Sequence, residues 1–222
     1  MGSQSEIKPI SRRWLTSIPE RIKSKGIIGF TSQAFKFALG KAGFAWRRGI
    51  IAECFLEEIA QEIKPSINVS IRLATKDDLI KFRGMVSRNK LETFKKRFEK
   101  GRVCFIALDK DKIAYYRWAS LENEYESNFD FTIQLNRNEA YIFDAFSQPQ
   151  YRRCGLHIAI TNKALIYIKS QGYKRVQVVV YANNTFARKT LAKVGFQGKQ
   201  TVTLVTLFGL KYHLWREFKG NL

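Results

Sequence analysis

Strand-like and helix-like patterns alternate along the chain from residue 68 to residue 215, and this order limits the folds that the chain can adopt. Alternating or continuous apolar runs predict strands, whereas apolar residues three and four apart predict helices. We expect strands at 68–74, 102–108, 113–120, 140–147, 174–182 and 201–215, and a short one at 129–135; the turn 109–112 would join the second and third into a hairpin. We expect helices at 75–86, 91–100, 156–172 and 183–195. The segment 201–215 is compatible with one strand or with a hairpin.

Capping residues mark the ends of several of these helices. Thr75 is placed as an N-cap, and Asp77 and Asp78 follow in the first turn, where the helix dipole favours negative charge. Gly172 and Gly195 each follow a helix-like segment. Glycine is a common stop there because it adopts the left-handed backbone that ends a helix.

The size and composition fit one domain with an appendage, or two small domains. The chain has 222 residues, of which 45% are hydrophobic and 14% aromatic, enough for a packed core. The uncharged run at 201–210 is too short to span a bilayer. The N-terminus is basic but has no hydrophobic region of the signal-peptide kind. We therefore expect a cytoplasmic protein.

Cysteine and histidine are too few and too scattered to predict a metal site. Cys54, Cys104 and Cys154 form no C-x-x-C pair, and only His157 and His213 could join them as ligands. An odd number of cysteines without a pairing pattern fits free thiols in a reducing compartment. We expect no metal cofactor.

The charge is strongly positive. Thirty-nine Lys and Arg residues against nineteen Asp and Glu residues give a formal net charge of +20. Such an excess fits an anionic partner, namely nucleic acid, a membrane surface or a polyphosphate ligand. It fits equally well a protein in which Lys is simply the solubilising residue. No nucleic-acid recognition motif is present, so we predict no specific nucleic-acid binding.

The first part of the chain differs from the rest. Residues 1–48 hold ten basic and two acidic residues. We therefore divide the chain into a basic N-terminal extension, residues 1–66, and a main domain, residues 67–222. A weak contact of residues 1–48 with an anionic membrane is one expectation for this extension.

Two segments of the extension have their own patterns. The segment 31–46 is compatible with one helix, which either packs on the main domain or lies on a membrane. The apolar face of that helix would hold Phe35, Leu39, Ala42 and Trp46. The segment 49–59 fits a strand or a helix.

The link between the predicted strand 140–147 and the predicted helix 156–172 reads "SQPQYRRCG" from residue 147. A helix that begins directly after a loop presents backbone N–H groups without intrahelical partners, and its dipole adds positive potential. Gly155 lets a ligand approach the backbone, and Arg152 and Arg153 add charge. The loop therefore fits a phosphate or pyrophosphate. It contains neither a Walker loop nor a dinucleotide-binding glycine fingerprint.

Several spaced motifs from residue 68 to about residue 215 resemble the GNAT superfamily of acyl-CoA-dependent N-acyltransferases. The loop "RRCGLH" (152–157) is similar to the family's pyrophosphate loop, Q/R-x-x-G-x-G/A, after a strand end similar to "SQPQYR" (147–152). Further on, Asn184, Ala187, Leu191, Gly195 and Phe196 keep the intervals of the family pattern N-x-x-A-x-x-x-Y-x-x-x-G-F. The order of these motifs makes the resemblance more specific than one glycine loop.

The resemblance implies a layered α+β fold. In it a mixed, mostly antiparallel central sheet with a splayed strand pair is flanked by helices. It also implies transfer of an acetyl or other acyl group from acyl-CoA to a primary amine, by direct attack in a ternary complex. The amine acceptor would be a small molecule or a peptide. A homodimer is a further expectation.

The resemblance also implies roles for individual residues. A backbone N–H near Phe146 or Ser147 would bind the thioester carbonyl and stabilise the developing oxyanion. Asn183 or Asn184 would contact the pantetheine arm. Backbone N–H groups of the loop would bind the pyrophosphate, with Arg152 as charge support; they belong to Arg153, Cys154, Gly155, Leu156 and His157.

Two positions depart from the family pattern. His157 stands where Gly or Ala is usual, and it is either a phosphate donor or a surface residue. Leu191 stands where the family usually has a Tyr whose hydroxyl protonates the departing thiolate. Tyr181, Ser147 or water would then take that role, or the protein binds coenzyme A without catalysis.

Candidate bases and acceptor contacts complete the prediction. Asp144 lies mid-strand, where burial would raise its pKa toward a useful value, unless a neighbouring Arg or hydroxyl satisfies it. Glu139 is the second candidate base, and Ser147 the third catalytic candidate. Tyr116 and Trp118 would line the acceptor pocket, or lie in the core by strand alternation. The acidic residues Glu122, Glu124 and Glu126 would recognise a cationic amine, or form a solvated loop.

Overall fold

The structure is a computed structural model that describes residues 44–59 and 61–222. One compact unit comprises residues 47–204 and 213–222. The second includes the described residues 44–46 and 205–212. In this second unit the turn at Phe208 and Gly209 has positive φ at both residues, 49° and 82°. That backbone is typical of a tight hairpin turn, so the segment 201–215 forms a hairpin.

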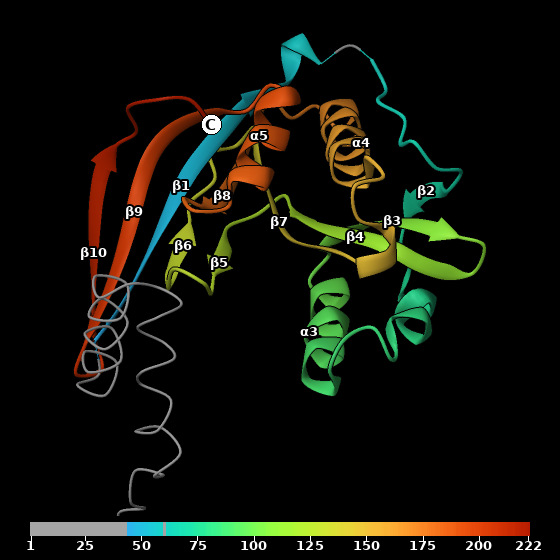
Figure 1. Ribbon diagram of the computed structural model, residues 1–222, viewed down its shortest axis with the longest axis horizontal. Coiled ribbons are helices and arrows are strands. Elements are labelled where there is room, and N and C mark those ends of the chain that lie inside the picture. Colours follow the sequence, from blue (N-terminus) through green and yellow to red (C-terminus); the bar gives the residue numbers. More distant parts are fainter. Residues whose placement is uncertain (1–43, 60) are drawn as a thin grey trace, which may run out of the picture. The chain divides into compact units, whose positions relative to one another are not determined.

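The strands follow the predicted order closely. They are β1 (Ala45–Phe55), β2 (Ser70–Leu73), β3 (Val103–Asp109), β4 (Lys112–Ser120), β5 (Glu124–Glu126), β6 (Phe131–Ile133), β7 (Glu139–Ser147), β8 (Arg175–Tyr181), β9 (Gln197–Leu207) and β10 (Leu210–Glu217). Eight of them form one sheet in the order β10-β9-β1-β8-β7-β4-β3-β2, and β5 pairs with β6 (Figure 1). The pairs β1–β8, β2–β3, β3–β4 and β4–β7 are antiparallel, and β7–β8 is parallel. The expected mixed, mostly antiparallel sheet is confirmed.

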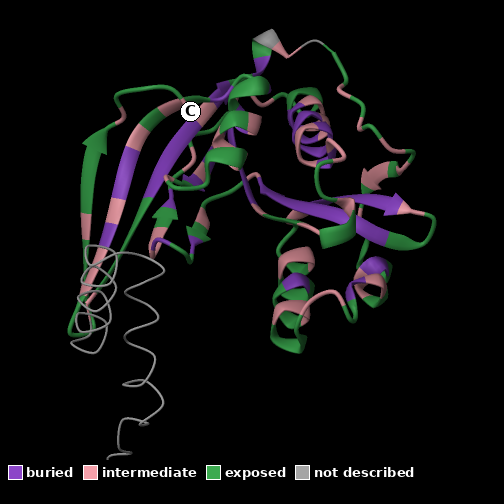
Figure 2. Ribbon diagram, viewed as in Figure 1, coloured by how far each residue is buried: buried purple, intermediate pink, exposed green. Residues whose placement is uncertain are grey.

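Helices cover both faces of this sheet. They are α3 (Arg88–Glu99), α4 (Leu156–Ser170) and α5 (Thr185–Lys193), with short 3₁₀ segments η1 (Leu56–Glu58), η2 (Lys76–Phe82) and η3 (Pro149–Tyr151). Figure 1 shows α4 and α5 on one side of the strands β7 and β4, and α3 on the other. The central strands are largely buried (Figure 2). The expected α+β layering is therefore present.

Each face of the sheet has its own apolar cluster. On the α4 side, Ile160 and Leu165 pack with Val176 of β8. On the α3 side, Phe94 packs with Trp118 of β4 at a ring-centroid distance of 5.1 Å. Because strand residues alternate between faces, β4 sends Tyr115 and Arg117 toward α4, and its neighbouring aromatic residues toward α3. This alternation decides which side chains reach the candidate site.

One local prediction needs correction, and one open alternative is resolved. The helix expected at 75–86 is only the 3₁₀ segment η2. Asp78 accepts from the Thr75 N–H at 2.9 Å, as at a helix start, but the extended backbone of Arg83 ends the segment. Gly84 then follows at φ +80°. The ambiguous segment 49–59 supplies most of β1, whose apolar residues are buried inside the sheet.

Strand β1 lies within residues 1–66, so part of the segment that the sequence analysis set apart belongs to the central sheet. Trp46 is in β1 and not at the end of a helix. The other residues of that expected helical face, Phe35, Leu39 and Ala42, lie outside the described residues. The division at residue 66, and the membrane contact of residues 1–48, stay predictions.

Candidate active site

Strands β7 and β8 separate at one end. They pair in parallel from Glu139 opposite Arg175 to Ile142 opposite Val178. Beyond this point β7 continues to Ser147 and β8 to Tyr181 without pairing to each other. The expected splayed strand pair is therefore present, and it exposes backbone groups of β7 on the side that β8 has left.

A β-bulge lies where the separation begins. On β4, Arg117 pairs with Ala145 and the next residue, Trp118, pairs with Phe143. Asp144 is the extra residue of β7, and its φ is +37°. A bulge of this kind bends the strand and re-aims the residues that follow it.

The bulge fixes the direction of the Ser147 backbone. The Gln148 N–H donates to the carbonyl oxygen of Ala114 at 3.0 Å, and Ser147 pairs with Tyr115. In an antiparallel ladder this combination makes Ser147 part of a non-hydrogen-bonded pair. Its N–H therefore faces away from β4, toward the side from which β8 has diverged. Such a donor is suited to a carbonyl oxygen that develops negative charge.

The loop after β7 ends at the N-terminus of α4. Gly155 is the N-cap at φ +74°, and Arg153 also has a positive φ of 64°. The first intrahelical hydrogen bond runs from the Ala159 N–H to the Gly155 carbonyl. The N–H groups of the first helical turn therefore have no partner within the helix and form an anion-binding end. The loop is held in place by the Ser66 N–H, which donates to the Cys154 carbonyl at 3.1 Å.

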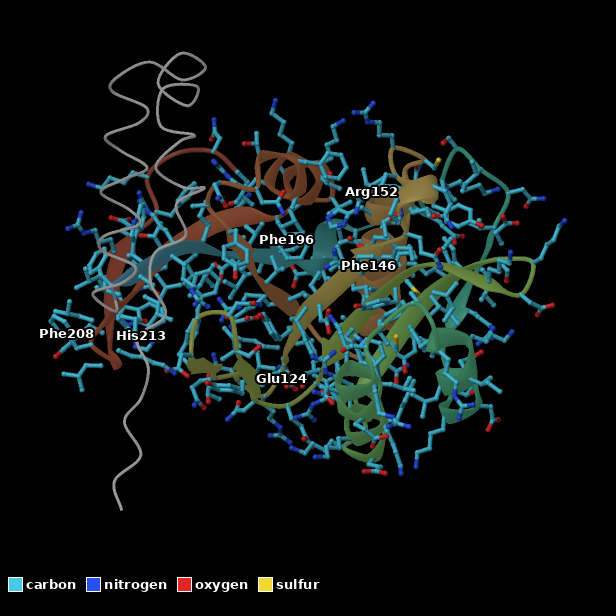
Figure 3. All side chains as sticks on the ribbon, turned by 60° about the horizontal axis from the view of Figure 1, so that its bottom comes forward. Glu124, Phe146, Arg152, Phe196, Phe208 and His213 are labelled. Atoms are coloured by element: carbon cyan, nitrogen blue, oxygen red, sulfur yellow. The ribbon has the colours of Figure 1, made fainter. Side chains whose placement is uncertain are left out.

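A cavity of about 580 Å³ lies over the end of β7, the loop and the first turn of α4. In Figure 3, Phe146 marks the end of β7 and Arg152 the loop that follows. Arg152, Arg153 and Lys193 line the cavity, and no Asp or Glu is among its lining residues. The cavity therefore combines positive charge with helix-end N–H groups, as a polyphosphate ligand requires.

Eight of the ten residues predicted to bind acyl-CoA line this cavity. They are Phe146, Ser147, Arg152, Arg153, Gly155, Leu156, His157 and Asn184. Cys154 and Asn183 are not among the lining residues, and the Cys154 thiol donates to the Arg152 carbonyl at 3.5 Å. Asn184 also caps α5, because its Oδ1 accepts from the Ala187 N–H at 3.1 Å. The individual ligand contacts stay predictions.

The expected rise in the pKa of Asp144 is wrong in direction. Burial raises the pKa of its carboxyl, but Arg97 and Lys90 outweigh this and hold the pKa below its ordinary value. The Asp144 oxygens lie 2.5 Å from Arg97 Nη1 and 2.9 Å from Lys90 Nζ, and Tyr116 donates to the same carboxylate at 3.3 Å. A carboxylate held by two cations is a weak base, so the structure favours the alternative in which neighbouring Arg and hydroxyl groups satisfy Asp144.

Glu139 is bound at the opposite end of β7. Its carboxylate pairs with Arg175 and accepts from Gln177 Nε2 at 2.9 Å. It also accepts from the backbone and the side chain of Asn136. Glu139 is not among the residues that line the cavity at the Ser147 end of the strand. The structure thus gives it a structural role.

The residues predicted to bind the acceptor are occupied elsewhere. Tyr116 and Trp118 are almost fully buried under α3, as strand alternation allowed. Glu122 and Glu124 both pair with Arg102, at 2.8 Å and 2.6 Å. None of the four lines the cavity. Their assignment as acceptor contacts has no support from this arrangement.

The sequence did not predict two residues that contact the His157 side chain at the cavity, Tyr115 and Arg117. The Tyr115 hydroxyl lies 2.7 Å from His157 Nδ1 and 3.2 Å from Arg117 Nη2. Burial and the charge of Arg117 lower the pKa of His157 to about 3, so its ring is neutral. Burial raises the pKa of Tyr115, which therefore keeps its proton. The sequence signal that could have identified them is strand alternation, which places Tyr115 and Arg117 on the same face of β4.

Two other classes of site are not seen in the part of the chain that the structure describes. No cluster of three or more His, Cys, Asp or Glu residues is arranged to hold a metal ion. No described helix combines the length and the apolar character that a membrane span needs.

Residues 73–196 match the sequence profile of the Acetyltransferase (GNAT) family, which is more than half of the chain. The chain belongs to the GNAT family. The anion-binding helix end and the splayed strands lie within the matched region. No curated protein shows significant sequence similarity to this chain.

Solved structures of other GNAT proteins share this fold. A GNAT acetyltransferase from Colwellia psychrerythraea is 12% identical with a TM-score of 0.55, over 78% of this chain and 61% of that chain. A GCN5-related N-acetyltransferase from Sphaerobacter thermophilus is 10% identical with a TM-score of 0.55, over 96% of this chain and 72% of that chain. A Drosophila protein is 14% identical with a TM-score of 0.53, over 82% of this chain and 58% of that chain. This GNAT chain thus spans about three fifths of the first and the third of these relatives, and the likeness concerns the fold.

Proposed function

We propose that this GNAT protein transfers an acetyl or other acyl group from acyl-CoA to a primary amine, by direct attack in a ternary complex. One observation carries the proposal. A single cavity joins an anion-binding helix N-terminus to the outward-facing N–H of Ser147 at the end of a splayed strand. Acyl-CoA carries a thioester and a pyrophosphate joined by a long arm. Such a ligand needs an oxyanion donor for its thioester and an anion-binding site for its pyrophosphate in the same cavity.

The residues of the chain would share the work in the following way. The N–H groups at the start of α4, with Arg152 and Arg153, would bind the pyrophosphate. The Ser147 N–H would donate to the thioester carbonyl oxygen and stabilise the charge that develops there. Holding the amine in line with the carbonyl carbon would supply much of the rate. Since Asp144 and Glu139 are already paired, the amine proton would leave to water in the open end of the cavity.

Calorimetric titration with acetyl-CoA and with free coenzyme A, at two salt concentrations, tests the binding step. We expect binding that persists at the higher salt concentration. Hydrogen bonds from the N-terminus of α4 and contacts of the pantetheine arm with the cavity should contribute to the affinity in addition to charge. Binding that disappears with salt, as for any polyanion, would contradict the proposal.

An amine screen with thiol release as the readout tests catalysis. Amino acids, peptides, polyamines, aminosugars and aminoglycosides cover the main acceptor classes. Turnover with any of them supports the acyltransferase. Tight binding without turnover would instead favour a coenzyme A-binding protein that lacks catalysis.

A further inference from the structure

Acyl transfer to an amine breaks the C–S bond of the thioester and leaves a thiolate. The thiolate needs a hydrogen-bond donor or a nearby positive charge, and the cavity must supply it. Leu191 brings no such group. Its side chain is apolar and 2% exposed in the core beneath α5. Tyr181, the alternative donor from the sequence, packs on Phe129 and does not line the cavity.

Four hydroxyl groups line the cavity, and three of them already donate to the protein. The Ser147 hydroxyl donates to the Gln148 carbonyl at 3.4 Å, and the Thr190 hydroxyl to the Phe186 carbonyl at 2.9 Å. The Tyr151 hydroxyl donates to Asp109 at 2.8 Å. The fourth hydroxyl belongs to Tyr115.

Tyr115 has surroundings that the other three lack. Arg117 Nη2 lies 3.2 Å from its oxygen, and the neutral ring of His157 lies 2.7 Å away. The same Arg117 nitrogen lies 3.3 Å from Nδ1 and 3.4 Å from Nε2 of His157. When His157 carries its one ring hydrogen on Nδ1, the phenol oxygen accepts from both neighbours. In that tautomer the hydrogen of the Tyr115 hydroxyl has no partner in His157 or Arg117, and it is available to a ligand in the cavity that Tyr115 lines.

Arg117 is the second independent observation. Its side chain is 2% exposed, its Nε has no hydrogen-bond partner, and no carboxylate among the described residues pairs with it. A buried cation without a counter-ion is costly. Its pairing with Ala145 on β7 places it beside the point where β7 and β8 separate. Arg117 is not among the residues that line the cavity, but Tyr115 and His157, which its Nη2 contacts at 3.2 Å and 3.3 Å, do line it.

We propose that Tyr115 donates a hydrogen bond to the sulfur of coenzyme A, and that Arg117 stabilises the thiolate through Tyr115. The inference rests on the proposed function and assigns the leaving-group residues of that same site. Tyr115 is the catalytic residue because it touches the sulfur. Arg117 and His157 are positioning residues because they act through the Tyr115 hydroxyl.

The reaction balances without a proton leaving Tyr115. The amine nitrogen forms a bond to the thioester carbon, the C–S bond breaks, and its electron pair stays on sulfur. The amine proton passes to water. The products are the amide, the thiolate of coenzyme A held by the Tyr115 hydrogen bond, and a solvent proton.

The test measures the ionisation of coenzyme A bound to the protein, in the absence of any acceptor. Thiolate absorbs in the ultraviolet and thiol does not, so the complex is titrated with pH against a blank of the S-methyl-CoA complex. We expect the bound thiol to hold about tenfold more thiolate than free coenzyme A at the same pH, a pKa lowered by about one unit. Tyr115→Phe should abolish the difference. Arg117→Met should reduce it, and Arg117→Lys should retain more of it than Arg117→Met does.

Tyr151→Phe is the matched control, because Tyr151 lines the same cavity but its hydroxyl is bound to Asp109. This variant should leave the ionisation of the bound thiol unchanged. Calorimetry with coenzyme A on every variant confirms that each one is saturated. If the wild-type protein binds coenzyme A but its thiol ionises as in solution, the inference is overturned and the proposed function stands. If the wild-type protein binds no coenzyme A, both are overturned.

Discussion

Arg117 Nη2 lies 3.2 Å from the hydroxyl oxygen of Tyr115, and both side chains are almost fully buried. No carboxylate among the described residues offsets this guanidinium charge. A protein that kept Arg117 for stability alone would be expected to pair it, because an isolated buried ion costs several kcal/mol. The unpaired charge instead fits a site whose counter-ion arrives with the substrate or forms in the reaction. A substitution of Arg117 should therefore change the stability of the protein and its function in different directions.

Arg117→Met should raise the free energy of unfolding by about 1–2 kcal/mol, because an apolar side chain replaces an unpaired ion. Urea unfolding monitored by circular dichroism gives the value. The matched variant is Arg175→Met, since Arg175 pairs with Glu139 and Glu53. That variant should lose about 3 kcal/mol, because it leaves the buried carboxylate of Glu139 without its cationic partner. Equal losses in both variants would show that Arg117 is an ordinary stabilising residue.

Gly155→Ala should weaken coenzyme A binding by about tenfold, or about 1.4 kcal/mol. Gly155 has a φ of +74° at the N-terminus of α4, and a side chain there strains the backbone that presents the N–H groups. Calorimetry measures the affinity. Gly101→Ala is the control, because Gly101 has a φ of +70° after α3 and open space around it. Both variants should lose about 1–2 kcal/mol of stability, but only the first should lose affinity.

The strand–loop–helix unit from β7 to α4 could be predicted because its signals are local. Apolar alternation defines the strand, and Gly155 and Gly172 mark the helix ends. The segment 49–59 stayed ambiguous because a short apolar run fits a central strand as well as a buried helix. Only its place between β9 and β8 settles that it is β1.

The contacts of the candidate site could not be predicted, since they depend on residues distant in the sequence. The pKa of Asp144 is lowered by Lys90 and Arg97 of α3, and no local pattern reports that approach. The contact of Tyr115 with His157 likewise needs α4 to be placed on one face of β4. Sequence alternation says that two side chains share a face, but not what that face meets.

Asp144→Asn should reduce the free energy of unfolding at pH 7 by about 3 kcal/mol, because Arg97 and Lys90 lose their shared carboxylate. The pKa of Asp144 is lowered in the folded state, so its contribution is present above the unfolded pKa of about 3.9. That contribution is lost as the pH falls through the folded pKa. Unfolding of both proteins at pH 7 and under strongly acid conditions should therefore show the difference shrinking at low pH.

The same variant tests the rejected role as general base. With any acceptor found in the amine screen, the pH dependence of kcat/KM should keep its acidic limb in Asp144→Asn. Disappearance of that limb would restore Asp144 as the base and contradict the conclusion drawn from its ion pairs.

His157 should make the folded protein lose stability between pH 7 and pH 5. Its pKa is about 3 in the folded state, against about 6.5 for an unfolded histidine, so the unfolded chain binds the extra proton in this range. Stability is therefore fully present above pH 6.5 and declines as the pH falls toward 3, by about 1.5 kcal/mol between pH 6.5 and pH 5. Urea unfolding across this window should show the decline in the wild-type protein and a flatter profile in His157→Gln. The decline should survive His213→Gln, which leaves His157 in place. A profile for His157→Gln as steep as that of the wild-type protein would show that His157 is charged in the folded state, and Tyr115 would then lack the neutral partner that frees its hydroxyl hydrogen for the cavity.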